Sequence, residues 1–386
     1  MKNIERLYYF LLLLSIQFAY FFIRILIFLS PFIKKNNPQK DLILFPYAQK
    51  GSTGYFQRFE IYFTFLKRDN IIFDAQDVFD DEYILSEIDK GIKTRYYLYS
   101  RIVWIRIFQV LKARNYKAAF YQRHLIPFLP DRKKALLEKL LFKLNPHVTV
   151  DYWDSDWVRS PQLINTLTRN YVHQISCINN FIEDHFNSVS TKKILFPMGI
   201  KLKNYIQKQN YSIDEQEIKL FYTGSLGNVR DFLKITKDAL LDLSERYSTK
   251  LIIVSRGEYY VDGLEIEYHK FSVDTFFSIM SSCDLGLYAM EDHEIGRGKM
   301  AMKTLDYWAS ALPSVVSPVG LSPYANNGED CLFSIDSDNF YSNIEKLILS
   351  SELRKEIGLK GYETAQKYHN IENNYEVFKQ IIKTNG

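Results

Sequence analysis

The sequence predicts an α/β chain with two doubly wound domains behind an N-terminal hydrophobic helical segment. The 386 residues exceed what one hydrophobic core usually supports. Short apolar runs alternate with longer amphipathic stretches in two series, which is typical of parallel sheets covered by helices. A polar stretch at residues 201–217 separates the two series and is the expected linker. We therefore expect a membrane-attachment segment at 1–38 and Rossmann-like domains at 39–200 and 201–369, with a C-terminal helix at 370–386 that packs back on the first domain.

Each predicted element rests on an apolar run or on helical periodicity. In the first series the expected strands are 42–45, 71–73, 118–121, 148–150 and 194–196, with helices at 55–67 and 132–144. In the second series the expected strands are 219–222, 251–254, 285–288 and 314–317, with helices ending near 247, at 274–281 and ending at 309. Ligands of such sheets lie beyond the carboxyl ends of the strands, so the loops there are the candidate sites.

Composition excludes several classes of protein. The chain is 47% hydrophobic and 16% aromatic, which excludes a disordered chain. Its formal net charge is only +4, which argues against a nucleic-acid partner bound through a broad basic surface. Cys177, Cys283 and Cys331 are far apart in sequence, so neither a disulfide framework nor a zinc site is expected.

Residues 7–33 are nearly all apolar, and Arg24 decides how they meet a membrane. A helix that spans the bilayer over this length would place Arg24 in hydrocarbon at a cost of about 2.5 to 3.5 kcal/mol. A re-entrant or in-plane anchor avoids this cost. The run is too long for a cleaved signal peptide and has no cleavage site after it. Attachment to a membrane surface is expected, and a buried hairpin of core helices is the alternative.

Basic residues follow the apolar segment at Lys34, Lys35 and Lys40. Positive charge next to a membrane segment favours the cytoplasmic side. We therefore expect the rest of the chain on the cytoplasmic face of the membrane.

The first candidate loop follows the strand at 219–222 and contains Gly224, Ser225 and Arg230. Glycines let the backbone approach a phosphate, and the start of a helix favours negative charge. Arg230 could add a bidentate contact to a diphosphate. Taken alone, such a loop is also typical of a plain structural turn.

The second candidate loop runs from Gly296 into the predicted helix that ends at 309. We expect Lys299 and Lys303 on one face of this helix, with Asp306 one turn further. Together with Arg297 they predict an anion site, and a solvated basic face is the alternative. The string also matches a dinucleotide fingerprint, but acidic residues stand where the strand before it should be, so a nicotinamide enzyme is rejected. A third loop closes the strand at 314–317 with Gly320 and exposes backbone amides.

In this order and spacing the loops resemble retaining GT-B glycosyltransferases of family 4, the glycosyl transferases group 1. The matching strings are Gly224-Ser-Leu with Arg230, Asp284-Leu-Gly-Leu, Arg297-Gly-Lys299 with Lys303 and Tyr307-Trp-Ala309, Leu312-Pro-Ser-Val-Val-Ser-Pro-Val-Gly320 and Asn327-Gly328. The match covers residues 218–365, and the N-terminal half resembles the family only in outline. The resemblance implies two Rossmann-like domains that face a cleft, with a nucleotide-diphosphate sugar as donor and no required cofactor.

The resemblance also implies roles for individual residues. Arg230 and Lys299 are the candidate catalytic cations on the leaving diphosphate, with Lys303 beside them. Asp306 occupies the position that holds the nucleotide ribose. The remaining donor-binding candidates are Gly224, Ser225 and Gly320. Many members carry two glutamates eight positions apart, whereas this chain has Gly298 and Asp306 there, so the residue that faces the sugar is not assigned.

The acceptor side is expected in the first domain. Its candidates follow two predicted strands, and they are Gly51, Ser52, Thr53, Gly54, Arg123 and His124. His124 is also a candidate catalytic residue, although a lone histidine among aromatic residues is more often structural. Asp154 and Asp156 are similar to the metal-binding pair of another glycosyltransferase fold. The donor features lie in the other half of the chain, so we expect loop or cap carboxylates there and no metal site.

The predicted function is transfer of a hexose-type sugar, with retention, to a glycan or lipid-linked acceptor in surface polysaccharide or glycoconjugate synthesis. Two alternatives stay open. One is a nucleotide-sugar epimerase of the same fold, which needs no membrane anchor. The other is a non-catalytic GT-B partner subunit, which the Gly298 departure favours.

Overall fold

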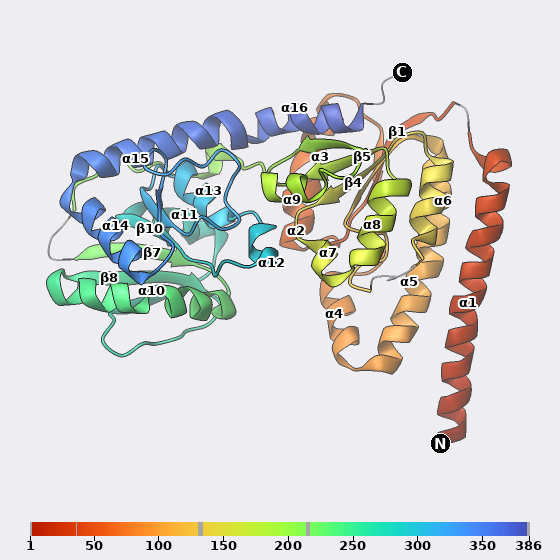
Figure 1. Ribbon diagram of the computed structural model, residues 1–386, viewed down its shortest axis with the longest axis horizontal. Helices are drawn as coiled ribbons and strands as arrows, with labels where there is room; N and C mark the ends of the chain where they lie inside the picture. The colour runs from red at the N-terminus through yellow and green to blue at the C-terminus, as the bar shows by residue number, and fades with distance from the viewer. Residues whose placement is uncertain (1, 36, 130–133, 214–216, 384–386) are drawn as a thin grey trace. The chain divides into compact units, whose positions relative to one another are not determined.

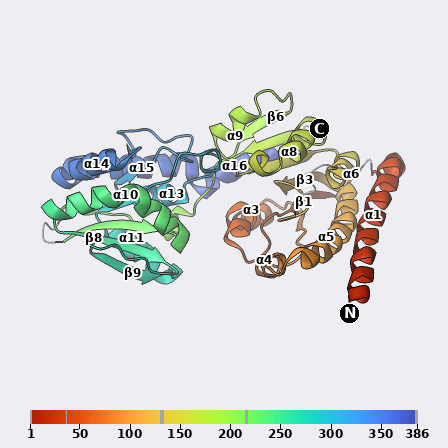
Figure 2. The ribbon, with the colours of Figure 1, turned by 60° about the horizontal axis from the view of Figure 1, so that its bottom comes forward.

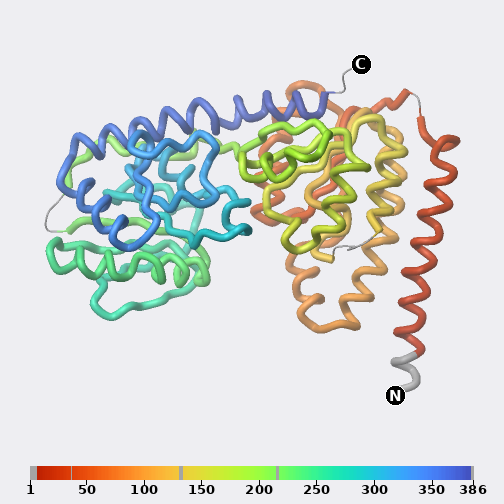
Figure 3. The backbone as a smooth tube through the Cα atoms, viewed as in Figure 1, coloured from red at the N-terminus to blue at the C-terminus, as the bar shows by residue number. Residues whose placement is uncertain are grey.

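The computed structural model describes residues 2–35, 37–129, 134–213 and 217–383 (Figure 1). The chain divides into two compact units. Unit 1 comprises Met1–Phe196 and Tyr375–Gly386, and unit 2 comprises Pro197–Asn374. The trace in Figure 3 follows the chain from unit 1 into unit 2 after residue 196 and back through the last helix.

Unit 1 is built on a parallel sheet of six strands in the order β2-β1-β3-β4-β5-β6. The strands are β1 (Lys40–Phe45), β2 (Phe73–Ala75), β3 (Tyr116–Gln122), β4 (Val148–Tyr152), β5 (Gln174–Cys177) and β6 (Lys192–Leu195). Both faces of such a sheet are covered, so its central strands are continuously apolar. In β1 the side chains from Leu42 to Phe45 are all buried, and Leu44 pairs with Phe120 of β3.

Helices cover both faces of the unit 1 sheet (Figure 2). They are α2 (Thr53–Tyr55), η1 (Phe56–Glu60), α3 (Ile61–Arg68), α4 (Asp81–Asp89), α5 (Ile92–Lys112), η2 (Ala113–Asn115), α6 (Leu136–Leu144), α7 (Asp156–Arg159), α8 (Pro161–Asn170) and α9 (Asn180–His185). The N-terminal α1 (Lys2–Ile33) lies beside α5 and α6. The last helix, α16 (Ile371–Ile382), completes the core through Phe378, which stacks on Tyr62 and Phe196.

Unit 2 is built on a second parallel sheet of six strands in the order β12-β11-β10-β7-β8-β9. The strands are β7 (Ile218–Thr223), β8 (Thr249–Ser255), β9 (Ile266–Lys270), β10 (Leu285–Tyr288), β11 (Ser314–Val316) and β12 (Leu332–Phe333). The remaining segments are η3 (Leu202–Asn204), α10 (Leu226–Arg246), α11 (Val273–Ser282), α12 (Glu294–Arg297), α13 (Met302–Ala309), α14 (Ser337–Leu349), α15 (Ser351–Thr364) and η4 (Ala365–His369). Its apolar core lies between the sheet and α10, α14 and α15.

The predicted fold class is confirmed, because both halves contain a doubly wound parallel sheet and an apolar helix precedes them. The strand predicted at 71–73 is displaced to Phe73–Ala75. The strands β5, β9 and β12 were not predicted, since β5 is partly polar, β9 is half exposed and β12 has two residues. Of the helix predicted at 132–144, residues 132 and 133 lie outside the described residues, as do 214–216 of the predicted linker.

Candidate active site

The strand order of unit 2 reverses between β7 and β10. The chain passes from β7 to β8 and β9 on one side, and then returns to the other side of β7 to form β10, β11 and β12. In open α/β sheets, ligands bind in the crevice at the carboxyl ends of the strands where the order reverses. The topology therefore places the candidate site of unit 2 at the ends of β7 and β10.

A cavity of about 270 Å³ lies at this place. It is lined by Tyr222, Asn228, Asp231, Lys234, Ile235, Tyr288, Ala289, Met290, Glu291, His293, Lys299 and Lys303. Tyr222 comes from β7 and Tyr288 ends β10, while the residues from Asn228 to Ile235 belong to the first turns of α10. Lysines reach the cavity from three different elements, which makes it suited to an anion with several oxygens.

Lys303 lies between two aromatic rings at the base of the cavity. Its ammonium is 5.3 Å from the ring centre of Tyr222 and 5.7 Å from that of Tyr288. Burial lowers the pKa of Lys303 to about 8; the neighbouring carboxyl of Asp306 acts to raise it and the charge of Lys299 to lower it. The ring faces attract a cation that has lost water. An anion that enters the cavity therefore meets an ammonium group that is poorly hydrated. The attraction between the two is strong because little water has to be displaced.

Both tyrosine rings are held in place by their hydroxyl groups. Tyr222 donates to the carbonyl of Asn228 at 2.9 Å and stacks on Phe232, with ring centres 4.0 Å apart. Tyr288 donates to the carbonyl of Val319 at 3.0 Å. The position of Lys303 is therefore set by the core of unit 2 and by the loop that ends at Gly320.

Lys299 reaches the cavity from a loop, and the prediction that it shares a helix with Lys303 is wrong. The short α12 ends at Arg297, and α13 begins only at Met302. The reason is a contact between two loops, in which the amide of Ala301 donates to the carbonyl of Gly320 at 2.6 Å. This bond draws the chain out of helical geometry. Lys299 and Lys303 nevertheless line the same cavity.

Gly320 is required where these two loops meet. Its φ is +64°, in the left-handed region. A Cβ added there would lie 2.6 Å from the carbonyl oxygen of Gly296 and 3.1 Å from that of Lys299. A side chain at this position would push the Lys299 loop away. Gly320 therefore contributes to the site by fixing the position of Lys299.

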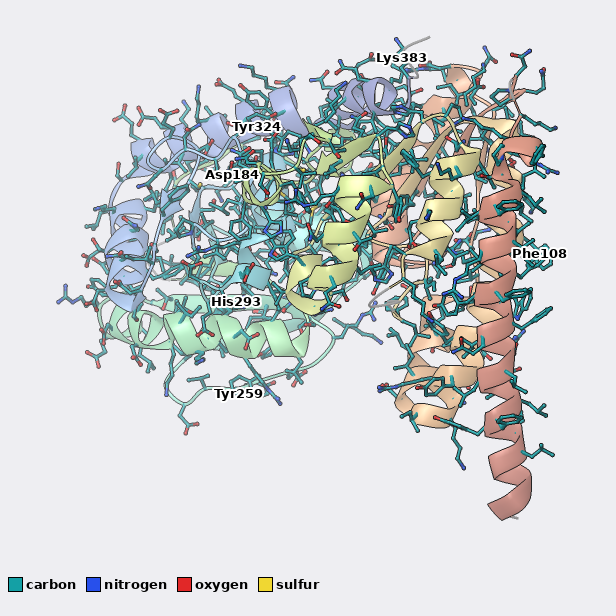
Figure 4. All side chains as sticks on the ribbon, turned by 45° about the vertical axis from the view of Figure 1, so that its right-hand side comes forward. Phe108, Asp184, Tyr259, His293, Tyr324 and Lys383 are labelled. Carbon is teal, nitrogen blue, oxygen red and sulfur yellow. The ribbon has the colours of Figure 1, made fainter. Side chains whose placement is uncertain are left out.

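Several cavity residues were missed by the sequence analysis. Lys234 lies two turns into α10, and from the sequence it is indistinguishable from a solvated lysine on a helix. Its ammonium is 3.7 Å from the carboxylate of Glu291. His293 caps α12 by accepting from the amide of Gly296 at 2.8 Å and is exposed (Figure 4). The two tyrosines read as strand residues. The signal that could have found them is their place at the ends of β7 and β10.

Arg297 was part of the predicted anion site, and its guanidinium instead binds the Asp292 carboxylate at 2.5 and 2.7 Å. Arg230 also points elsewhere. It is exposed, its guanidinium lies 5.4 Å from the ring centre of Tyr259, and it is not among the described residues that line the cavity. Residues Asn228, Asp231 and Lys234 form one face of α10, whereas Arg230 lies to the side of that face.

Three other donor-side candidates lie at the edge of this site. Gly224 follows β7, and Ser225 is the N-cap of α10, accepting from the amide of Asn228 at 3.4 Å. Asp306 accepts from the hydroxyl of Tyr205 at 2.6 Å, and burial raises its pKa to about 7. Among the described residues, none of these three lines the cavity.

Unit 1 has its own reversal of strand order, between β1 and β3. The loop after β1 carries four of the acceptor-side candidates, and two others follow β3. Gly51 has a φ of +91°, Ser52 caps α2, and Thr53 is exposed at the first position of α2. A Cβ on Gly54 would lie 2.4 Å from the ring of Trp153, so the loop approaches the end of β4 closely.

Arg123 and His124 follow β3 and pack on Tyr47 from the β1 loop. The guanidinium of Arg123 lies 4.2 Å from the ring centre of Tyr47, and the His124 ring meets the same ring edge-on at 5.2 Å. His124 is buried, and burial lowers its pKa to about 3, so the imidazole is neutral at ordinary pH. Arg123 and His124 thus pack on the segment after β1 that leads to Gly51.

The two carboxylates that follow β4, Asp154 and Asp156, form ion pairs with Arg123. Its guanidinium binds Asp156 at 2.6 Å and Asp154 at 3.4 Å. Burial raises the pKa of Asp156 to about 6, against the opposing effect of Arg123. Within the described parts of the chain, no group of three or more histidine, cysteine or acidic side chains is placed to hold a metal ion.

Comparison with known proteins agrees with this architecture. A family described as Glycosyl transferase-like matches residues 239–380. No curated protein matches the sequence. A glycosyltransferase from Rickettsia africae is similar in structure, with a TM-score of 0.64 at 12% identity, over 90% of this chain and 100% of that chain.

Two further solved structures are similar over most of their length. The HepE protein of Anabaena, in complex with UDP and glucose, has a TM-score of 0.58 at 12% identity and covers 89% of this chain and 100% of that chain. Sucrose-phosphate synthase from Thermosynechococcus elongatus has a TM-score of 0.59 at 10% identity. The similarity covers 89% of this chain and 98% of that chain. The chain thus has the fold of the GT-B glycosyltransferases, with a Glycosyl transferase-like segment at residues 239–380.

Proposed function

We propose that this chain is a glycosyltransferase that moves a hexose-type sugar from a nucleotide-diphosphate donor to a glycan or lipid-linked acceptor. The anomeric configuration is retained, and the product belongs to surface polysaccharide or glycoconjugate synthesis. The enzyme works at the cytoplasmic face of a membrane, to which its N-terminal segment attaches it. Unit 2 binds the donor, and unit 1 receives the acceptor.

One observation carries this proposal: three lysines line a cavity at the point where the unit 2 strand order reverses. A sugar nucleotide presents two linked phosphates, whose charge needs cations on more than one side. Lys299 approaches from the loop between α12 and α13, Lys303 from the first turn of α13, and Lys234 from α10. The similarity to HepE, which was solved with UDP-glucose, supports a donor of this class.

The chemistry follows from where negative charge develops. When the bond between sugar and diphosphate breaks, the leaving phosphate gains charge, and cations already in position stabilise it without rearranging. Lys303 is the strongest candidate because its ammonium is poorly hydrated before the donor arrives. Retention by attack from the leaving-group side requires no protein nucleophile. Lys299 completes the diphosphate contact from its loop.

We propose Lys234 for the α10 contact in place of Arg230. Lys234 lines the cavity, and its ammonium lies 3.7 Å from the carboxylate of Glu291, which lines it too. Ser225 and Gly224 shape the start of α10, where amide groups favour an anion. Asp306, held by Tyr205, sets the local charge around Lys303. Each of these roles acts on the donor side.

On the acceptor side, Arg123 and His124 form a rigid patch with Tyr47. His124 is neutral, so it serves as a hydrogen-bonding partner for an acceptor hydroxyl and not as a charged acid. Gly51 and Ser52, followed by Thr53 and Gly54 at the start of α2, are the other acceptor-side residues that we propose.

The test is release of free nucleotide from a panel of nucleotide sugars, with membrane lipid extract as acceptor. We expect one donor to be turned over by the full chain, and Lys299→Ala to lose that turnover while its melting temperature stays near wild type. Lys237→Ala, a change in the exposed part of α10 away from the cavity, is the control. Unchanged turnover in Lys299→Ala would reject its role.

The same panel separates the alternatives. An epimerase would convert the sugar of the donor without releasing nucleotide or needing an acceptor. A non-catalytic partner would release none from any donor, and titration calorimetry would detect no binding that depends on the diphosphate. Either result would overturn the proposed activity.

A further inference from the structure

The N-terminal helix α1 has two apolar faces, and only one of them is covered by the protein. The covered face consists of Leu12, Ile16, Ala19, Tyr20, Ile23, Leu26 and Ser30, all buried. The opposite face is apolar and exposed, and along one line of this face lie Leu7, Leu14, Phe21 and Phe28, which are spaced seven residues apart. Among these four side chains the exposed fraction is highest at Phe28, where it is 78%. Apolar patches of this extent on a folded protein mark a surface that meets lipid or another protein.

Polar contacts join α1 to α5. The hydroxyls of Ser15 and Ser100 are 2.9 Å apart, and the indole of Trp104 donates to Ser15 at 3.1 Å. The hydroxyls of Tyr20 and Tyr99 are also hydrogen-bonded. These bonds fix one rotation of α1 about its axis, so the direction of its exposed face is determined.

Aromatic contacts extend this docking along both helices. Tyr9 meets Tyr96 edge-on at 5.4 Å, and Phe18 and Phe22 each lie 6.0 Å from Trp104. Later residues of α1 thus meet later residues of α5, so the two helices run in the same direction. α1 is therefore part of unit 1 along much of its length.

This docking excludes α1 as a membrane-spanning helix. Its neighbour α5 carries Lys93, Arg95 and Arg101 with exposed side chains. If α1 crossed the bilayer, α5 would enter the hydrocarbon beside it, at about 2.5 to 3.5 kcal/mol for each of these charges. Arg24 on α1 would add to that cost.

We propose that α1 lies in the plane of the membrane, with its exposed face in the headgroup and upper acyl region of an anionic lipid bilayer. The exposed Phe108 of α5 extends the same surface beside α1 (Figure 4). Lys34 and Lys35, exposed at the C-terminal end of the helix, favour anionic headgroups by about 1 kcal/mol each. In a parallel pairing of two copies these lysines would meet and repel one another, whereas an anionic bilayer attracts them. The inference deepens the proposed membrane attachment and does not depend on the sugar chemistry.

Vesicle binding tests the surface. The full chain is sedimented with vesicles of phosphatidylglycerol and phosphatidylethanolamine, and with vesicles of phosphatidylcholine alone. We expect binding to the anionic vesicles, and at least tenfold weaker binding of the double variant Phe21→Glu with Phe28→Glu. The matched control is Ile335→Glu with Leu349→Glu, two residues of unit 2 that are 73% and 70% exposed. Equal binding of both double variants and wild type would reject α1 as the lipid surface.

Depth measurement tests the orientation. Nitroxide labels are attached to single cysteines introduced at Leu7, Leu14, Phe21 and Phe28, and the three native cysteines are buried and do not compete. The four positions span about 32 Å of helix. We expect the same shallow depth at all four, about 5 to 10 Å below the headgroups. A depth that rises to a maximum in the middle, with shallow ends, would show a spanning helix and overturn the in-plane orientation.

The outcomes also separate this inference from the sugar chemistry. Wild-type chain that stays in solution with both vesicle types would overturn membrane attachment itself. If it then forms a dimer that the Phe21→Glu and Phe28→Glu changes dissociate, the exposed face binds a second copy. Nucleotide release from a soluble donor is measured on the same samples and tests the activity independently of either result.

Discussion

The two units share a fold, yet the points where their strand orders reverse differ in how charge is compensated. In unit 1 the cation at that point, Arg123, is bound to Asp154 and Asp156 and stacked on Tyr47. In unit 2 the comparable place is a cavity, where Lys303 faces two tyrosine rings and its pKa is lowered by burial. The same topology therefore supports a buried, paired cation in one unit and a cavity lined by three lysines in the other. The side chains on the loops decide which.

The largest effect is expected from the ion pair of unit 1. Arg123→Ala leaves Asp156 buried without its partner, so we expect the free energy of unfolding to fall by about 3 to 5 kcal/mol in urea titration. The double variant Arg123→Met with Asp156→Leu removes both charges and is expected to recover most of this loss. If the single variant is as stable as wild type, the charge of Arg123 does not stabilise the buried Asp156 carboxylate. The contrast between the two units then fails.

Lys303→Met tests the desolvated cation of unit 2. We expect kcat/KM for the donor to fall by about 10²- to 10³-fold, as for removal of one charge-stabilising donor. Because folding lowers the pKa of Lys303, its charge costs folding free energy below about pH 8, and this cost fades as pH rises towards the unfolded value. The melting temperature at neutral pH is therefore expected to stay equal or rise. A fall in both activity and melting temperature would indicate a packing role.

Lys234 and Arg230 provide a sharper comparison within α10. Lys234→Ala is expected to raise KM for the donor by about tenfold, since an exposed cation contributes about 1 kcal/mol or somewhat more to a phosphate. Arg230→Ala is expected to change it less than twofold, because its guanidinium lies over Tyr259. Steady-state kinetics on both variants decides the assignment. The reverse order of effects would restore Arg230 as the diphosphate ligand.

The smallest effect is a pH dependence that belongs to unit 2 alone. Lys303 has a pKa of about 8 and faces Asp306, Lys299 and the two tyrosines, so it loses its charge above that pH. We expect KM for the donor to rise by up to about tenfold between about pH 8 and pH 9. The Lys303→Met variant is expected to lack this rise. A rise of the same size in the variant would assign the titration to another group.

The sequence predicted the sheets well because parallel strands buried on both faces are short apolar runs, as in β1 and β7. It failed where this signal is weak, as in the half-exposed β9. For the site, it predicted Lys299 and Lys303 from their spacing, and both line the unit 2 cavity, but it placed them on one helix. The bond between Ala301 and Gly320 joins residues 19 apart in sequence and has no local signal. Lys234 was missed for a similar reason, since only the fold aligns α10 with the end of β10.

The contribution of α16 to unit 1 bears on how the chain is assembled during synthesis. Phe378 packs against Tyr62, Phe120 and Phe196, yet it follows unit 2 in the sequence. Unit 2 is a single continuous stretch, so the ribosome releases all of it before the residues that close the core of unit 1. The part translated first is thus completed last. A chaperone that shields exposed apolar surface on nascent chains would therefore find its substrate in the amino-terminal half.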